Sequence, residues 1–118
     1  MEGKQMTSEL RYIVKGFSVD DLSTELDRLW QELKKESKLR AQAEAAGIDL
    51  KALQTMGRGQ AITARREGEG LDPATSAVVI AFAPVVAKIV ADLWTHVLLP
   101  RIRQARGADA ITPKPNSS

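Results

Sequence analysis

The chain of 118 residues contains no cysteine, and this absence excludes disulfides, thiolate zinc sites and thiol catalysis together. A chain without cysteine fits a reducing cytosol. Aromatic residues make up only 4% of the sequence, so a hydrophobic core must be built from aliphatic side chains. At this length we expect one domain with a core of modest size.

A large excess of charge of one sign is also missing, because 17 basic residues are nearly balanced by 15 acidic ones. This balance lacks the concentrated basic surface of a nucleic-acid-binding protein, so we expect no nucleic acid among the partners. The opening residues, MEGKQMTSEL, contain no apolar run, and no secretory signal is expected. The expected location is therefore the cytoplasm, with a peripheral or inserted position at the inner membrane as the alternative.

A catalytic constellation is absent as well. Asp92 and His96 are one helical turn apart, and a carboxylate that orients an imidazole is the beginning of a nucleophilic site. The nearest hydroxyl, that of Thr95, points elsewhere on a helix, and the chain has no second histidine. Two ligands also do not complete a metal site. We expect a protein without enzymatic activity, metal or cofactor.

Two short strands are predicted. Residues 10–15, LRYIVK, alternate apolar and polar side chains and are followed by Gly16, which ends the strand. Residues 60–67, QAITARRE, could form the second strand, with Ile62 and Ala64 on one face.

A long amphipathic helix is predicted between these strands. Ser18 and Asp21 form a capping signal, so the helix is expected from about 19 to 46, where Gly47 stops it. Its buried side is a stripe of leucines, Leu22, Leu26, Leu29 and Leu33, with Trp30 beside it.

Short, punctuated segments follow the long helix. Asp49 is expected to cap a brief helical segment through residues 50–56, which Gly57 and Gly59 break. Further along, turn-forming residues predict a hinge at Gly68, Gly70 and Pro73.

Residues 73–100 form the most apolar part of the chain. From Ala77 to Ala87, a run of 11 residues, no side chain is charged or strongly polar. We predict one apolar helix over 74–99 that is bent at Pro84. We expect the helical conformation to end at Gly107. The face of this helix toward a membrane or a partner is predicted to consist of Val86, Ile89, Val90, Leu93, Trp94 and Val97.

Polar residues mark the second half of this segment. Lys88, Asp92 and His96 recur every four residues and so share one side of a helix. A basic flank follows, and its cations would balance the negative end of the helix dipole or meet anionic lipid head groups. This flank consists of Arg101, Arg103 and Arg106.

The free energy for inserting this helix alone into a bilayer is close to zero or unfavourable. Between residues 78 and 99 there are 12 side chains of the Val, Ile, Leu or Phe type. On an insertion scale they contribute about −4 to −7 kcal/mol, whereas Lys88 and Asp92 together cost about +5 to +7 kcal/mol. Two alternatives remain. Either several copies associate so that the charges pair or line a lumen, or the helix packs in a soluble bundle against the leucine stripe.

The predicted fold is therefore mainly α, with a long amphipathic helix and a long apolar C-terminal helix; the two short strands, where they form, make the class α+β. A single helical domain is expected over residues 10–107. Residues 1–9 and the tail at 108–118, which includes TPKPNSS, are expected to be disordered.

The segments LRYIVKG, QAITARREGEG and SAVVIAFAPVVAKIVADLW, followed by LLPRIR, carry a resemblance that covers about half of the chain. In the order of strand, capped helix, second strand and apolar helix, the chain resembles small accessory proteins encoded beside caspase-like, trypsin-like or TIR effectors in bacterial conflict operons. These are sometimes called effector-associated components. The resemblance implies a non-enzymatic member of a defence module, with a helix that acts at a membrane or docks onto its effector. Lys88 and Asp92 depart from a plain apolar anchor.

We therefore expect an accessory or effector protein that acts through its C-terminal apolar helix, at a membrane or in an oligomeric assembly. The alternative is a soluble α-helical adaptor whose apolar helix is its core and which binds a partner protein. The expected partner is another protein or a second copy of the chain, with an anionic membrane as a further candidate.

Overall fold

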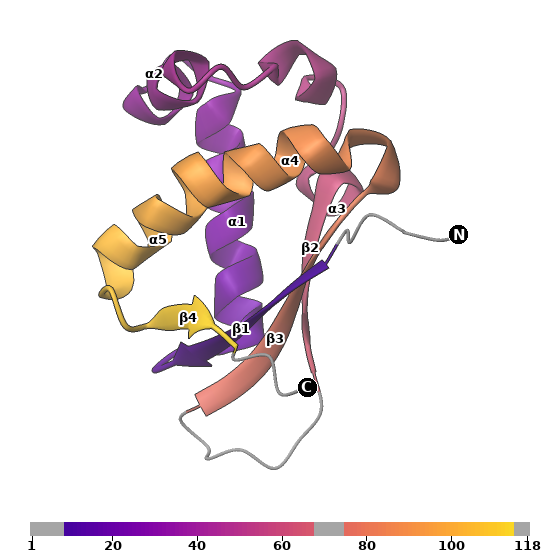
Figure 1. The fold of residues 1–118 in the computed structure, drawn as a ribbon. Helices are drawn as coiled ribbons and strands as arrows, with labels where there is room; N and C mark the ends of the chain where they lie inside the picture. The colour runs from indigo at the N-terminus through magenta and orange to yellow at the C-terminus, as the bar shows by residue number, and fades with distance from the viewer. Residues whose placement is uncertain (1–8, 68–74, 115–118) are drawn as a thin grey trace.

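The computed structural model describes residues 9–67 and 75–114 of the chain. It shows an α+β fold in which helices pack on an antiparallel sheet of four strands (Figure 1). The elements follow in the order β1 Glu9–Lys15, α1 Val19–Leu33, α2 Lys38–Ala45, η1 Leu50–Leu53, α3 Arg58–Ala61, β2 Ile62–Arg66, β3 Thr75–Phe82, η2 Pro84–Val86, α4 Ala87–Leu93, η3 Trp94–Leu98, α5 Leu99–Arg106 and β4 Ile111–Pro113.

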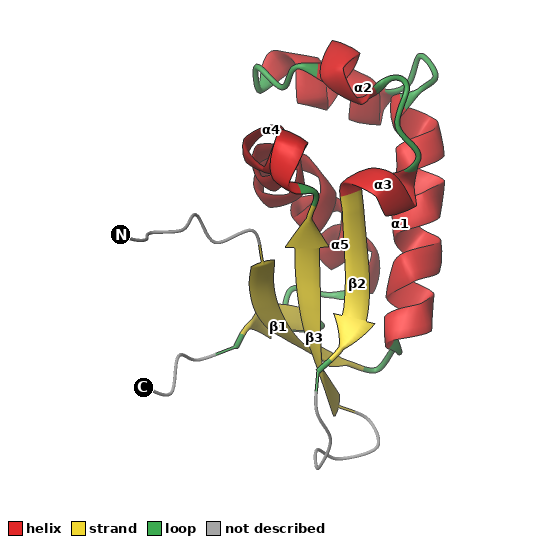
Figure 2. Ribbon diagram, turned by 90° about the vertical axis from the view of Figure 1, so that its right-hand side faces the viewer, coloured by secondary structure: helices red, strands yellow, loops and turns green. Residues whose placement is uncertain are grey.

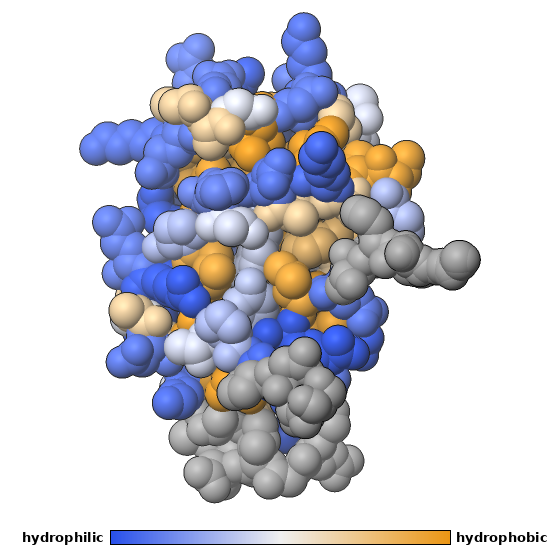
Figure 3. Space-filling model, viewed as in Figure 1, coloured by the Kyte–Doolittle hydropathy of each residue, from blue (hydrophilic) through white to orange (hydrophobic). Residues whose placement is uncertain are grey.

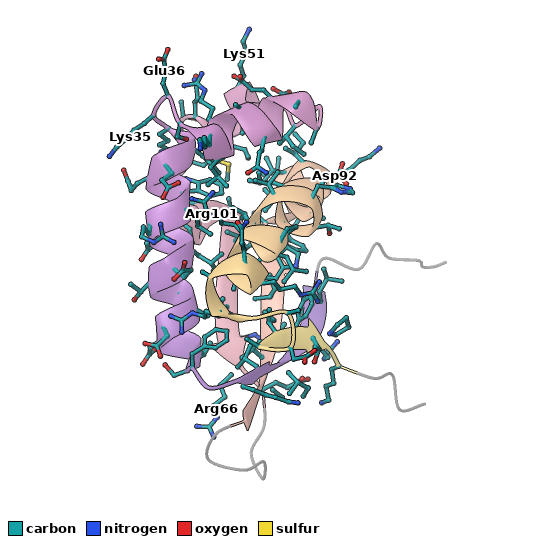
Figure 4. All side chains as sticks on the ribbon, turned by 90° about the vertical axis from the view of Figure 1, so that its left-hand side faces the viewer. Lys35, Glu36, Lys51, Arg66, Asp92 and Arg101 are labelled. Atoms are coloured by element: carbon teal, nitrogen blue, oxygen red, sulfur yellow. The ribbon has the colours of Figure 1, made fainter. Side chains whose placement is uncertain are left out.

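The strand order in the sheet is β2-β3-β1-β4, so each strand-helix-strand unit has a third strand between its two strands. Together with the chain order β-α-β-β-α-β, this is the split β-α-β topology. Helix α1 and the C-terminal helical segment, which comprises residues 84–106, cover one face of the sheet (Figures 2 and 4). No described helix covers the other face. This topology serves many unrelated functions, so it does not by itself indicate one.

The first helix begins where the sequence predicts and ends earlier. The hydroxyl of Ser18 accepts the N–H of Asp21 at 3.0 Å, and the Asp21 carboxylate accepts the N–H of Ser18, which completes the predicted capping box. The prediction of one helix to residue 46 is wrong, because α1 ends at Leu33. The Ser37 hydroxyl then accepts the Arg40 N–H at 3.1 Å and starts α2 as a separate helix. The expected stop at Gly47 is confirmed, with φ at 81°.

The apolar segment is divided between a strand and a helix, so the predicted single helix over 74–99 is wrong. Its first half, Thr75–Phe82, is β3 at the middle of the sheet. The β-branched run Val78, Val79 and Ile80 favours an extended chain, because such side chains pack well on a pleated surface. Both predicted short strands are confirmed as β1 and β2.

Proline marks the start of the C-terminal helix, where a bend was predicted. Pro84 is the first residue of η2, a position at which the missing N–H costs nothing. The helix widens further along, and in η3 the N–H of Leu99 donates to the carbonyl of Trp94, five residues earlier. Pro100 follows directly, and its ring would clash with a carbonyl in a regular α-helix. The predicted end at Gly107 is confirmed, with φ at 112°.

The remaining predictions on the connections have mixed outcomes. A short helical turn does follow Asp49, but the Asp49 side chain does not cap it. Gly57 begins a further short helix, α3, instead of only breaking the previous one.

The predicted disorder at both termini also needs correction where the structure describes them. Glu9 belongs to β1, and Ile111–Pro113 forms β4 and pairs with β1, so the tail is not disordered from residue 108 onward. The predicted hinge at Gly68, Gly70 and Pro73, the N-terminal residues 1–8 and the last residues 115–118 lie outside the described residues.

The hydrophobic core lies between the sheet and the helices. The leucine stripe of α1 is buried as predicted, with Leu22 and Leu29 fully enclosed. The strands contribute the other layer through Tyr12, Val78 and Ile80. Trp94 is fully buried against Tyr12, whose ring centroid is 5.6 Å away.

Candidate functional site

The face predicted for a membrane or a partner is part of the core. Val86, Val90, Leu93, Trp94 and Val97 are all buried and pack with the leucine stripe and the inner side of the sheet. Ile89 is half-buried at the margin of the same cluster. These side chains therefore contact the chain itself, and in this fold they are not available to lipid or to a partner.

The predicted polar stripe is exposed. Lys88, Asp92 and His96 are all accessible to solvent, and Figure 4 shows Asp92 on the side of α4 that faces away from α1. No ion pair joins Lys88 to Asp92 in the part of the chain that the structure describes. One large apolar side chain, Val85, is 84% exposed nearby, where Figure 3 shows a small hydrophobic patch over the connection from β3 to α4.

The predicted basic flank is engaged within the molecule. Arg101 lies 3.6 Å from a carboxylate oxygen of Glu32 on α1. Arg106 lies 3.8 Å from Glu25 and its guanidinium is 4.4 Å from the ring centroid of Phe17. Arg103 donates to a backbone carbonyl of β4 at 3.1 Å. These cations connect the C-terminal helix to α1 and to an edge strand, and they do not form a free basic patch.

Within residues 9–67 and 75–114, no group of three or more His, Asp or Glu residues could hold a metal ion. None of the helices in the same residues has the length and apolar character needed to cross a membrane. A groove lies between α2 and the C-terminal helix. Its polar lining consists of the amides of Gln42 and Gln104 and the guanidinium of Arg101, and its apolar lining of Val97 and Pro100.

The face of the sheet that carries no described helix presents a different arrangement, and we call it the outer sheet face. Val79 of β3 lies between Arg11 of β1 and Arg65 of β2 in the strand register. Lys114 continues this row beyond Arg11, since its N–H donates to the Arg11 carbonyl at 3.0 Å. A row of three cations and one valine therefore crosses the sheet in the order Arg65, Val79, Arg11 and Lys114.

Carboxylates occupy the neighbouring rows of the outer sheet face. Glu9 is level with Ala81, and Glu67 is level with Ala77, to whose carbonyl its N–H donates at 2.8 Å. The face is thus ordered in rows along the strands, with cations in one row and a carboxylate on either side. Its remaining members are Ile13, Thr63 and Thr112.

Two ion pairs cross over the middle strand from opposite sides. The Arg11 guanidinium is 2.7 Å from Glu67, and the Arg65 guanidinium is 3.2 Å from Glu9. Each pair joins β1 to β2 above β3, and the aliphatic stems of the arginines cover the apolar surface beneath them. Val79 consequently has no exposed surface although no described helix covers it.

The stronger of these pairs perturbs both of its members. The hydrogen bond from Arg11 is the main reason why the pKa of Glu67 lies below its ordinary value, and the charges of Lys114 and Arg11 add to the effect while desolvation opposes it. The same hydrogen bond raises the pKa of Arg11. Lys114 is 3.5 Å from Glu67 and Arg11 is 3.8 Å from Glu9, so the pairs form one network.

Sequence reasoning did not find the outer sheet face. The alternation in β1 placed Leu10, Tyr12 and Val14 on one side, and the same alternation puts Glu9 and Arg11 on the other. That signal was present in the sequence. The partners of these residues come from β2, 56 residues away, and only the sheet topology brings them together.

No protein-family model, curated protein or solved structure matches this chain. The resemblance to accessory components of bacterial conflict operons therefore stays a prediction.

Proposed function

We propose that the protein is a non-enzymatic adaptor or accessory protein that binds a partner protein through its outer sheet face. The observation that carries the proposal is the apolar middle strand beneath two crossing ion pairs. A strand that is apolar on both sides is typical of a sheet covered on both faces. Here β3 has helices on one side and, on the other, the side chains of the two crossing ion pairs.

The two ion pairs that cover β3 are of a kind that a binding protein can displace. Arg11 and Arg65 are about half exposed, at 49% and 56% of their side-chain surface. Exposed pairs of this kind contribute little to the stability of a protein, because solvent screens the attraction between the charges. A partner could therefore replace these pairs with its own charges at little cost and gain the contact with Val79, Ala77 and Ala81.

The other partner classes have less support. Sheets that bind single-stranded RNA stack bases on aromatic side chains of their middle strands. On this sheet the aromatic residues of the middle strands, Tyr12 and Phe82, belong to the core cluster on the inner side. Action in a bilayer through the C-terminal helix would require Leu93 and Trp94 to leave the core in which they are fully buried.

Site-specific photo-crosslinking tests the proposal. A photoreactive residue replaces Thr63, which is exposed on the outer sheet face, in cells that make the protein. The matched control places the same residue at Thr95. Thr95 is exposed on the layer of helices that packs against the inner face of the sheet, which we call the helical layer. We expect a protein adduct from position 63 and little or none from position 95.

The adduct pattern separates the alternatives. Adducts that form from position 95 and not from position 63 would overturn the proposal and favour the polar stripe of α4 and η3 as the binding surface. Flotation of the protein with vesicles that contain anionic lipid, together with no adduct from position 63, would favour the membrane alternative.

A further inference from the structure

The order of charges on the outer sheet face identifies what can bind it. We infer that its occupant is a second copy of this chain, packed face to face about a two-fold axis; the inference rests on the proposed function and names the partner. In an isologous interface each contact occurs twice. If one residue of the first copy touches a second residue of the other copy, the second residue of the first copy also touches the first residue of the other. The face must therefore be complementary to itself, and its rows can be tested for that property.

The relevant axis crosses the strands between the row of Val79 and the row of Ala81. Rotation about this axis places Val79 of each copy over Ala81 of the other. In the same operation Glu9 of each copy lies over Arg11 of the other, because these two residues occupy the same two rows on β1. Opposite charges and apolar side chains thus meet their complements in one arrangement.

The spacing between packed sheets is compatible with these contacts. Sheets that pack face to face are about 10 Å apart, and arginine and glutamate side chains from facing sheets can span that distance. Glu9 is free to change partner because its present pairs, at 3.2 Å and 3.8 Å, are longer than the 2.7 Å pair that holds Glu67. The strong Arg11–Glu67 contact can persist while Glu9 pairs across the interface.

The area of the face predicts a weak, concentration-dependent dimer. Strands of seven, five, eight and three residues, spaced about 4.8 Å apart and rising about 3.3 Å per residue, give a face of about 360 Å². Two copies would bury about 700 Å² in total, which is less than a stable, specific interface buries and fits only a weak, transient contact. We therefore expect a monomer in dilute solution and a dimer in concentrated solution.

Sedimentation equilibrium over a range of protein concentrations tests the inference. The wild-type average mass should rise from that of one chain toward twice that value. Glu9→Arg places two arginines against each other on either side of the axis, so the association constant should fall about tenfold or more. Asp92→Arg is the matched control, since it makes the same charge change on an exposed residue of the helical layer and should leave association unchanged.

A charge exchange and a second position give independent checks. The double variant Glu9→Arg with Arg11→Glu restores opposite charges across the same axis, so it should associate more strongly than Glu9→Arg alone. Thr63 lies one row from Arg65 on β2, so the axis places it over Arg65 of the other copy. Thr63→Glu should strengthen association and Thr63→Lys should weaken it. Circular dichroism confirms that each variant is folded.

The outcomes distinguish this inference from the proposed function. A wild-type protein that stays monomeric at every concentration, or equal effects of Thr63→Glu and Thr63→Lys, would overturn the dimer. A crosslinked adduct from position 63 whose mass is not twice that of the chain would also overturn the dimer, while it would support a different protein as the partner. An adduct of twice the chain mass supports both.

Discussion

The indole N–H of Trp94 donates to the hydroxyl oxygen of Tyr12 at 2.9 Å inside the core, and the two rings meet edge to face at 68°. This contact joins the C-terminal helix to the first strand across 82 residues of sequence. It also fixes which side of the helix faces the sheet. The polar stripe of α4 and η3 therefore lies in solvent, and no described helix covers the outer sheet face.

Removal of the Tyr12 hydroxyl should destabilise the protein. In Tyr12→Phe the Trp94 N–H stays buried without its acceptor, which costs about 1–3 kcal/mol of unfolding free energy. Urea denaturation at neutral pH measures this loss. A cost below about 0.3 kcal/mol would mean that water or another group satisfies the indole, and that the contact does not help to fix the helix.

The leucine stripe of α1 should be essential for stability. Leu29 has no exposed surface, and Leu29→Ala should cost about 2–5 kcal/mol because it removes buried methyl groups and leaves a cavity. Val85→Ala is the control truncation at a side chain that is 84% exposed, and it should cost less than about 0.5 kcal/mol. Similar losses for the two variants would contradict the assigned core.

Lys88 and Asp92 should be energetically independent or nearly so. Both are exposed and have no ion pair with each other in the described part of the chain. Their coupling in a double-mutant cycle with Lys88→Met and Asp92→Leu should be at most about 0.3–0.5 kcal/mol, because solvent screens it and lysine precedes aspartate. Coupling above about 1 kcal/mol would place this stripe in a dry interface.

The Arg11–Glu67 pair should make stability depend on pH in acid. Because the pKa of Glu67 is lowered in the folded state, the pair stabilises the protein above the ordinary carboxyl pKa of 4.5. That contribution is lost as the pH falls through the lowered pKa of the folded state. Wild type should therefore be more stable than Glu67→Gln near neutral pH, and the two urea midpoints should converge in acid. A difference that stays constant with pH would show that the carboxylate is not paired.

Much of the local structure can be predicted from the sequence. Ser18 and Asp21 mark the start of α1 because capping depends on neighbouring residues, and the leucine spacing marks its buried side. The segment at Thr75–Phe82 was predicted as a helix because an apolar run without a period fits a buried strand and a buried helix equally well. The three residues of β4 give too short a pattern to detect, and they are ordered by their pairing with β1.

The candidate site depends on contacts that local patterns do not contain. Outward-facing charges on β1 are visible in the alternation of that strand, but a single strand does not reveal its neighbours. The apolar helix face was assigned to a membrane or a partner because the sequence does not show that α1 and the sheet already cover it. Tertiary packing made Trp94 a core residue and made Val79 the centre of the outer sheet face.

Methyl NMR of the two valines Val79 and Val85 tests most directly whether the outer sheet face is the binding surface. Val79 lies at the centre of that face, and Val85 is the most exposed apolar side chain of the helical layer. When the protein is concentrated, or when it meets the partner identified by crosslinking, we expect the Val79 methyl signals to shift and those of Val85 to stay unchanged. Shifts at Val85 with unchanged Val79 signals would contradict this expectation and assign binding to the helical layer.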